Sequence, residues 1–292
     1  MSNIPSAVRP PRFADDRWYS SDGNQLREEI QTYFTGAPAS PAGLMGLIAP
    51  HAGYFFSGHV AGAAFAGLTP GAFDTVILIG PDHRGAALGS IATPNAAVWR
   101  TPLGDIPVDW DMLQVLHAEI GLTFLPSDEE HSLEVELPFL QMALERFQLI
   151  PLMMGDQSPA ICRRLGEALV KTLAPPPEGE AGGERRVLFV ASSDLSHYFD
   201  DDTARRLDQT TLQFILKLDA AGLLEHVTQG RRQGQPLACG AGPIAVVIQA
   251  AAALGATEAT LLKYATSADA HPHRDRVVGY AAVAISKSAA KE

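Results

Sequence analysis

The chain has 292 residues, of which 46% are hydrophobic and 19% charged, and its mean hydropathy is +0.04. This balance is typical of a soluble globular protein with ample core, built as one large domain or two small ones. The formal net charge of −11 argues against binding to a nucleic-acid backbone.

The sequence carries no sign of secretion or of membrane insertion. Its two cysteines, Cys162 and Cys239, cannot form a framework of disulfides, which favours a reducing compartment. Residues 1–12 lack an apolar signal core, and no stretch approaches the roughly 20 apolar residues that span a bilayer. We therefore predict a cytoplasmic protein that binds neither nucleic acid nor a membrane.

Apolar, β-branched runs alternate along the chain with segments of helical spacing. We predict an N-terminal arm at residues 1–23, packed on a single domain at residues 24–292. In chain order, the first half has a helix at 25–33, a strand at 44–49, a helix at 58–67, a strand at 75–79, and helices at 110–120 and 133–147. Pro138 must lie in a first turn or at a kink, because it has no N–H to donate.

The second half continues the alternation. It has a strand at 149–153, a helix at 158–173, a strand at 187–191, helices at 202–217 and 220–226, and a helix after Gly242. The last two strands, at 260–266 and 277–285, are adjacent in sequence, so we expect them to be antiparallel or at a sheet edge. The Pro- and Gly-rich segment 175–183 is typical of an exposed loop. The pattern predicts an α/β fold with a central mixed sheet flanked by helices.

Histidines follow two of the predicted strands. His51 lies in the motif APHAGY at residues 49–54, and His83 lies in GPDH at residues 80–83. Because the carboxyl ends of strands in an open α/β sheet form the ligand crevice, we expect both imidazoles to point into it. A histidine hydrogen-bonded within a turn is the alternative, but the repeated placement favours ligand or catalytic roles.

Asp194 and His197 follow the strand predicted at 187–191, in the motif SSDLSH at residues 192–197. Their three-residue spacing places both on one side of a turn. A carboxylate near an imidazole can orient it and raise its basicity, as a general base or the partner of a metal ligand requires. Helix capping by Ser193 or Asp194 is an alternative that is compatible with a site.

Cys239 is the soft candidate ligand. A free cysteine is more often a small buried hydrophobe, and we interpret Cys162 in this way because it lies within a predicted helix. Cys239 differs because the flanking Gly240 and Gly242 put little bulk around its thiol.

His131 lies in the acidic segment DEEHSLE at residues 128–134. A capping box formed by Ser127 and Glu130 would explain the acidic residues but not the histidine, which we predict to line the pocket. The remaining histidines are interpreted as solvated loop residues or ordinary helix positions; they are His59, His117, His226, His271 and His273.

Taken in order, these motifs resemble those of the Memo family, whose bacterial and archaeal members are labelled AmmeMemoRadiSam system protein B. The resemblance covers nearly the whole chain and includes RP at 9–10, WY at 18–19, SG at 57–58 and VGY at 278–280. Any one of these motifs is weak, whereas six in the right order are specific.

The Memo family is similar to the class III extradiol ring-cleaving dioxygenases, which hold non-haem Fe(II) with two histidines and a carboxylate. The resemblance therefore implies a dioxygenase-like fold and a metal site with His51 and His83 as ligands, in which Cys239 takes the place of the carboxylate. It implies His197 as the acid/base histidine and His131 as a residue of the substrate pocket. We predict catalytic roles for His197, His131 and Asp194.

Two departures from the dioxygenase pattern bear on the metal. Two imidazoles and a thiolate suit Cu and Zn as well as Fe, so Cys239 weakens the dioxygenase interpretation while strengthening the metal-binding one. Asp82 stands where a smaller polar residue is expected before the histidine.

Three functions compete. The leading hypothesis is a cytoplasmic, metal-dependent redox protein that holds iron or copper, with zinc as the alternative. The second is a non-enzymatic module whose crevice binds a peptide or partner protein, and the third is a working non-haem iron dioxygenase. We expect a small molecule or a peptide in the crevice, and the family label makes a radical SAM protein and an AMMECR-type protein plausible partners.

Overall fold

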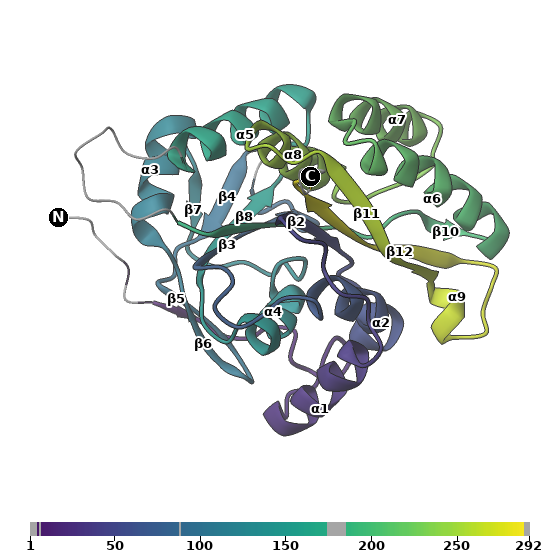
Figure 1. Ribbon diagram of the computed structural model, residues 1–292, viewed down its shortest axis with the longest axis horizontal. Coiled ribbons are helices and arrows are strands. Elements are labelled where there is room, and N and C mark those ends of the chain that lie inside the picture. Colours follow the sequence, from purple (N-terminus) through teal and green to yellow (C-terminus); the bar gives the residue numbers. More distant parts are fainter. Residues whose placement is uncertain (1–4, 6, 88, 174–184, 289–292) are drawn as a thin grey trace.

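The computed structural model describes residues 5, 7–87, 89–173 and 185–288. Within these residues, nine strands form one mixed sheet (Figure 1). They are β2 (Leu44–Ala49), β3 (Thr75–Pro81), β4 (Ile91–Pro94), β7 (Thr123–Leu125), β8 (Gln148–Met154), β9 (Val187–Ser192), β10 (His197–Phe199), β11 (Glu258–Thr266) and β12 (Val277–Ser286). The strand order is β10-β12-β2-β9-β3-β8-β4-β7, and β11 pairs with β12 outside this path.

Parallel pairing dominates the centre of the sheet. Strands β2, β9, β3 and β8 run parallel, whereas β12 pairs antiparallel with β2 and with β11. The expectation that the last two strands are antiparallel to each other is confirmed. The central strands are buried along most of their length, as expected for strands covered on both faces.

Helices cover both faces of the sheet. They are α1 (Gly23–Phe34), α2 (Tyr54–Phe65), α3 (Trp110–Ile120), α4 (Leu137–Leu144), α5 (Pro159–Leu173), α6 (Asp201–Leu216), α7 (Ala220–Arg232), α8 (Ala241–Ala253) and the short α9 (Ser267–Ala270). Helices α1, α2 and α4 lie on one side, and α3, α5, α7 and α8 on the other (Figure 1). The predicted α/β fold with a mixed sheet flanked by helices is confirmed.

The most apolar helices are the most enclosed. Helix α8 contacts β2, β3, β9, α5 and α7, and almost all of its residues are buried. Helix α2 packs against α1 through Gly58 and Gly62, where an added Cβ would lie 2.5 and 2.6 Å from side-chain atoms of Tyr33. Glycine is therefore required at both positions for the two helices to approach this closely.

Differences from the predicted elements are at helix ends and in short strands that were not predicted, such as β4, β7 and β10. The helix predicted at 133–147 is a 3₁₀ turn, Glu134–Glu136, followed by the shorter α4, with Pro138 in its first turn. Helix α7 continues to Arg232, beyond its predicted end. The loop predicted at 175–183 lies outside the described residues. Among the residues that the structure describes, no helix is long and apolar enough to cross a membrane.

The N-terminal segment adds a strand to a second, smaller sheet. Strand β1 (Val8–Arg9) pairs parallel with β5 (Val98–Thr101), which pairs antiparallel with β6 (Gly104–Pro107). Residues 8–22 thus lie against the domain, while the division of the chain at residue 23 stays a prediction.

Candidate metal site

The candidate side chains gather beyond the carboxyl ends of three neighbouring parallel strands. His51 follows β2, His83 follows β3, and Asp194 follows β9. Cys239 precedes α8, and its backbone N–H donates to the Asp194 carbonyl oxygen at 3.3 Å. The sheet order β2-β9-β3 brings these loops together at one edge although they are far apart in sequence.

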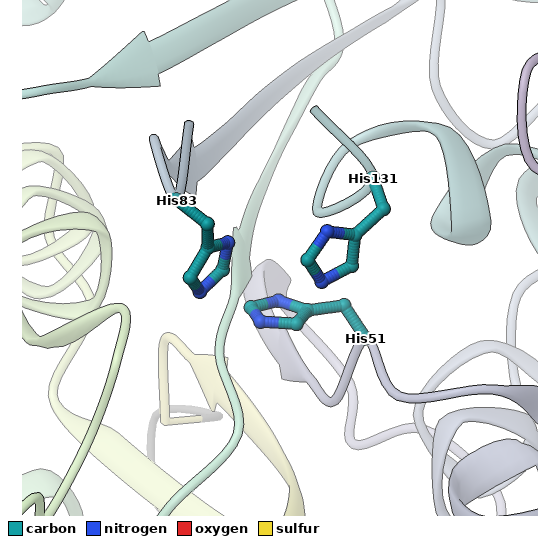
Figure 2. Close-up of side chains that lie close together, drawn as sticks. All are labelled: His51, His83 and His131. Carbon is teal, nitrogen blue, oxygen red and sulfur yellow. The ribbon is translucent and has the colours of Figure 1, made fainter. Parts of the chain in front are cut away.

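Three histidines form a compact group of potential metal ligands among the described residues. Ligand nitrogens of His51, His83 and His131 all lie within 4.8 Å of one another, and their rings face a common centre (Figure 2). The His83 and His131 rings are stacked with centroids 4.8 Å apart, and His51 lies edge-on to both, at 5.2 and 5.3 Å. Such a group could hold a metal ion.

A chain of buried hydrogen bonds orients the His51 ring. Its Nδ1 lies 2.7 Å from the Ser192 hydroxyl oxygen, which in turn lies 2.6 Å from the Ser132 carbonyl oxygen and 2.8 Å from Glu136 Oε1. Because the hydroxyl donates onward, it accepts from Nδ1–H, so Nε2 is the nitrogen of His51 whose lone pair can bind a metal. Burial and the neighbouring histidines lower the pKa of His51, which favours the neutral imidazole that a metal requires.

The Glu130 carboxylate contacts the Nδ1 atoms of the other two histidines. Its Oε1 lies 3.0 Å from His83 Nδ1 and 3.2 Å from His131 Nδ1, and it accepts from the backbone N–H of His131 at 2.9 Å. Burial opposes the carboxylate, but the hydrogen bond from His83 and the adjacent imidazoles outweigh it and lower the pKa of Glu130 to about 2. The predicted capping box is therefore wrong: Glu130 is a charged support for the cluster, and the following 3₁₀ turn begins only at Glu134.

The contact of His131 with Glu130 is close but poorly aligned. The Nδ1 atom of His131 is buried and has no hydrogen-bond partner of acceptable geometry. Burial lowers the pKa of His131 to about 4, so the ring is neutral near pH 7. An imidazole that is neutral and weakly held is available to an ion.

Cys239 lies beside the cluster on the His51 side. Its Sγ is 3.2 Å from His51 Nε2, and the Asp194 backbone N–H donates to it at 3.3 Å. Burial and the nearby Asp194 carboxylate raise the pKa of the thiol, so it is protonated in the absence of a metal. The sequence predicted Cys239 as third ligand and His131 as a pocket residue; the structure places both next to His51, and the choice between them stays a prediction.

Asp194 and His197 border the same region but do not hydrogen-bond to each other. The Asp194 carboxylate accepts from the His51 backbone N–H at 2.9 Å, and its burial raises its pKa to about 7. His197 Nδ1 instead bonds the Leu195 carbonyl oxygen at 2.8 Å. The helix-cap alternative for Asp194 is wrong, because β10 and not a helix follows it.

The N-terminal segment closes the His131 side of the cluster. The Trp18 ring lies 4.3 Å and the Phe13 ring 5.8 Å from the His131 ring, measured between centroids. Fully buried Glu134 holds this segment: it accepts from Arg9 Nη1 at 2.5 Å, from the Phe13 backbone N–H at 2.8 Å and from the Tyr19 hydroxyl at 2.6 Å. Sequence reasoning missed this role of Glu134, whose partners lie more than a hundred residues away.

The other side opens into a cavity of about 490 Å³. His83, His197 and Cys239 line it together with residues of α7 and the loop that follows. The His83 side chain is 31% exposed, whereas His51 is 1% exposed, so access to the cluster from this side passes His83.

The residues interpreted as ordinary have ordinary surroundings. Cys162 is fully buried in the core, and His117 bonds the Leu122 carbonyl oxygen at 2.9 Å. Asp82 accepts from the backbone N–H groups of Arg84 and Ala87, which gives this unexpected residue a structural reason in the loop that carries His83.

The donor set indicates which ions fit. Imidazole nitrogens and a thiol suit Fe, Cu or Zn and not the oxygen-binding Mg²⁺ or Ca²⁺. The protein thus has an α/β fold with such donors at the carboxyl ends of its central strands, and this class of protein can hold a transition-metal ion. The family model for Memo-like proteins matches residues 9–284, and the chain belongs to the Memo family.

Archaeal relatives match over almost the whole chain. A MEMO1 family protein of Methanosarcina mazei is 36% identical over 280 residues, covering 95% of this chain and 99% of the relative. A MEMO1 family protein of Methanopyrus kandleri is also 36% identical, and the match covers 96% of this chain and 99% of the relative. One from Pyrobaculum aerophilum is 37% identical over 82% of each chain.

Proposed function

We propose that this protein binds one iron or copper ion at the histidine cluster and uses it in redox chemistry. The observation that carries the proposal is the convergence of His51, His83 and His131 within 4.8 Å, with the Cys239 thiol 3.2 Å from His51. Ser192 and Glu130 hold the Nδ1 atoms of His51 and His83, as the outer partners of metal ligands commonly do.

His51 and His83 are the two shared ligands of this proposal, and Cys239 is its third. His131 is the competing donor, because it belongs to the tight group that Cys239 does not join. A thiolate favours Cu(I) or Zn, whereas a site of imidazoles alone is less soft. The identity of the third ligand therefore decides which metal the site prefers.

The chain's own residues supply the proton chemistry. A bound iron or copper ion would supply one-electron steps. His197 lines the cavity with its Nδ1 bonded to the Leu195 carbonyl, so its Nε2 is the atom that exchanges a proton with a ligand there. Asp194 fixes the His51 backbone and, with a pKa of about 7, exchanges a proton near neutral pH.

The test is elemental analysis of protein purified anaerobically. We expect stoichiometric iron or copper in the wild type and in the control His273→Ala, and none in the double variant His51→Ala/Cys239→Ser. A module that binds only peptides would contain no stoichiometric metal in any sample, which would overturn the proposal. Oxygen uptake with a panel of catechols tests the dioxygenase alternative.

Single variants separate the two candidates for the third ligand. His131→Ala and Cys239→Ser are compared by competition between Cu(I) and Fe(II). If Cys239 is the ligand, Cys239→Glu shifts the preference toward Fe(II), because it restores a two-histidine, one-carboxylate set. Unchanged preference in Cys239→Glu together with metal loss in His131→Ala would assign the third position to His131.

The cellular setting is proposed from the sequence alone. We place the protein in the cytoplasm, with a radical SAM protein and an AMMECR-type protein as partners. Cell fractionation checks the first statement, and co-purification of a tagged chain with these two partners checks the second. Absence of both partners at native expression levels would remove that part of the proposal.

A further inference from the structure

The cavity beside the cluster has features that the metal proposal does not use. Its wall is apolar where Val227, Pro236, Leu237 and Ala238 line it, and its size, about 490 Å³, is within the range of small-molecule sites. Leu237 and Ala238 are 1% and 4% exposed, so this wall is a fixed part of the core.

The loop that forms this wall is held at both ends. The His197 backbone N–H donates to the Pro236 carbonyl oxygen at 3.0 Å, and the Cys239 backbone N–H donates to the Asp194 carbonyl oxygen at 3.3 Å. At its other end, the Gln235 backbone N–H donates to the Gly230 carbonyl oxygen in α7 at 2.8 Å. The cavity is therefore preformed, which reduces the entropy that a ligand loses on binding.

Positive charge lies at one rim of the cavity. Arg231, at the end of α7, lines it, and among the described residues no carboxylate is paired with this guanidinium. The guanidinium of Arg276 lies 5.1 Å from the ring of Tyr198, which also lines the cavity. Arg231 thus offers a guanidinium to a ligand beside the apolar wall of the cavity.

Tyr198 is held in an unusual conformation at this rim. Its φ is +68°, in the left-handed region that non-glycine residues rarely adopt, and the residue is 61% exposed. Such backbone strain clusters at ligand sites. The Tyr198 ring is thus exposed beside the cavity and not buried in the core.

We propose that this cavity binds a small organic monocarboxylate, with its carboxylate on Arg231 and its apolar body against Val227 and Leu237. The guanidinium fork matches the geometry of a carboxylate. A carboxylate is favoured over a phosphate ester because two of its oxygens match the planar fork of one guanidinium, and because the acidic chain disfavours a dianion. The inference deepens the proposed function, since the apolar body would reach the wall beside His83, His197 and Cys239.

The test uses metal-free protein and calorimetric titration with 2-naphthoate, 2-naphthamide and 2-naphthyl phosphate. We expect naphthoate to bind about tenfold more tightly than the neutral amide. Arg231→Gln should abolish this advantage and leave amide binding unchanged, whereas the control Arg232→Gln, next along the helix, should leave all three affinities unchanged.

Three outcomes would overturn the inference. They are equal binding of acid and amide, equal losses in Arg231→Gln and Arg232→Gln, and tighter binding of the phosphate ester than of the carboxylate. Metal content measured on the same variants keeps the two proposals apart. If the protein purified anaerobically contains no metal but its metal-free form binds the carboxylate, only the redox site is refuted. If the purified protein contains metal but its metal-free form does not bind the carboxylate, only this inference is refuted.

Discussion

The two sides of the histidine cluster are built in opposite ways. On the His131 side, aromatic rings of the N-terminal segment cover the cluster, and the buried carboxylate of Glu134 fixes that segment with charged and neutral donors. On the His83 side, a cavity opens whose wall is apolar, and Arg231, which lines it, has no carboxylate partner among the described residues. On the closed side the charged groups are paired with each other, whereas on the open side the Arg231 guanidinium has no carboxylate partner among the described residues.

This difference shows that charged side chains can serve either the stability of the fold or the binding of a ligand. A buried ion pair holds structure because the loss of either partner strands the other in the core. An exposed, unpaired arginine contributes little to folding and is free to bind a ligand. Changes on the closed side should therefore cost stability, and changes on the open side should cost binding.

The largest effect is expected for Glu134→Ala. It leaves Arg9, which is 4% exposed, without one of its two buried acidic partners and releases the donors of the N-terminal segment. We expect the free energy of unfolding in denaturant to fall by about 3–5 kcal/mol. The control Glu129→Ala breaks a pair whose carboxylate is 72% exposed and should cost about 0–1 kcal/mol. Equal losses would abolish the distinction between the two kinds of charge.

Asp208 extends the comparison to a buried carboxylate whose contribution to stability depends on pH. It lies under the loop of His197, accepts from the Ser196 backbone N–H at 2.8 Å and from the Tyr264 hydroxyl at 2.7 Å, and is near Arg205. Burial raises its pKa from 3.8 to about 6, because these donors compensate the charge only in part. Its protonated form stabilises the fold fully below pH 3.8, and this contribution is lost as the pH rises through 6.

The variant Asp208→Asn does not titrate. Its stability relative to the wild type should therefore rise by about 3 kcal/mol between pH 3.8 and 6. Denaturant unfolding at closely spaced pH values measures this difference. A difference that stays constant across the window would show that Asp208 has the same pKa in the folded and unfolded chain.

A smaller effect is expected where the hydroxyl of Ser192 orients His51. Ser192→Ala removes the acceptor of Nδ1–H, and we expect the affinity for the metal to fall about 10- to 100-fold. Competition with a chelator of known affinity measures it. Ser90→Ala, whose hydroxyl bonds Ala87 and Thr123 away from the cluster, is the matched control. Identical affinities in the two variants would refute the orienting role.

The smallest effect on folding is expected for Arg231→Gln. Because its guanidinium has no carboxylate partner in the described part of the chain, we expect the free energy of unfolding to change by no more than about 0.5 kcal/mol. Thermal unfolding checks this expectation. A large loss of stability would show that Arg231 belongs to the scaffold and would erase the contrast between the two sides.

The sequence predicted the regular framework well because its signals are local. The strand 44–49 and the helix 110–120 have their predicted bounds, since each is a long run of one periodicity. The shortest strands, such as β7 and β10, were missed because three residues carry no usable pattern. The placement of His51 and His83 at strand ends was likewise readable from the chain.

The arrangement around His131 could not be read in this way. Its loop packs on Gly80, where a Cβ would lie 2.6 Å from Ser132 Oγ and 2.8 Å from a methyl carbon of Leu133. The missing side chain of a distant glycine thus sets where His131 points. The partners of Glu134 are equally remote, so only the assembled fold shows that an acidic motif serves the cluster and the N-terminal segment.

The parallel pairing of β2, β9 and β3 also governs when the site can exist during folding. No two of the three histidines come from one hairpin or one helix, so no local fragment of the chain presents two of them in the right place. Long-range strand pairing forms slowly compared with local structure. An ion would therefore bind only after the central strands have paired, and metal binding would indicate that the native sheet has formed.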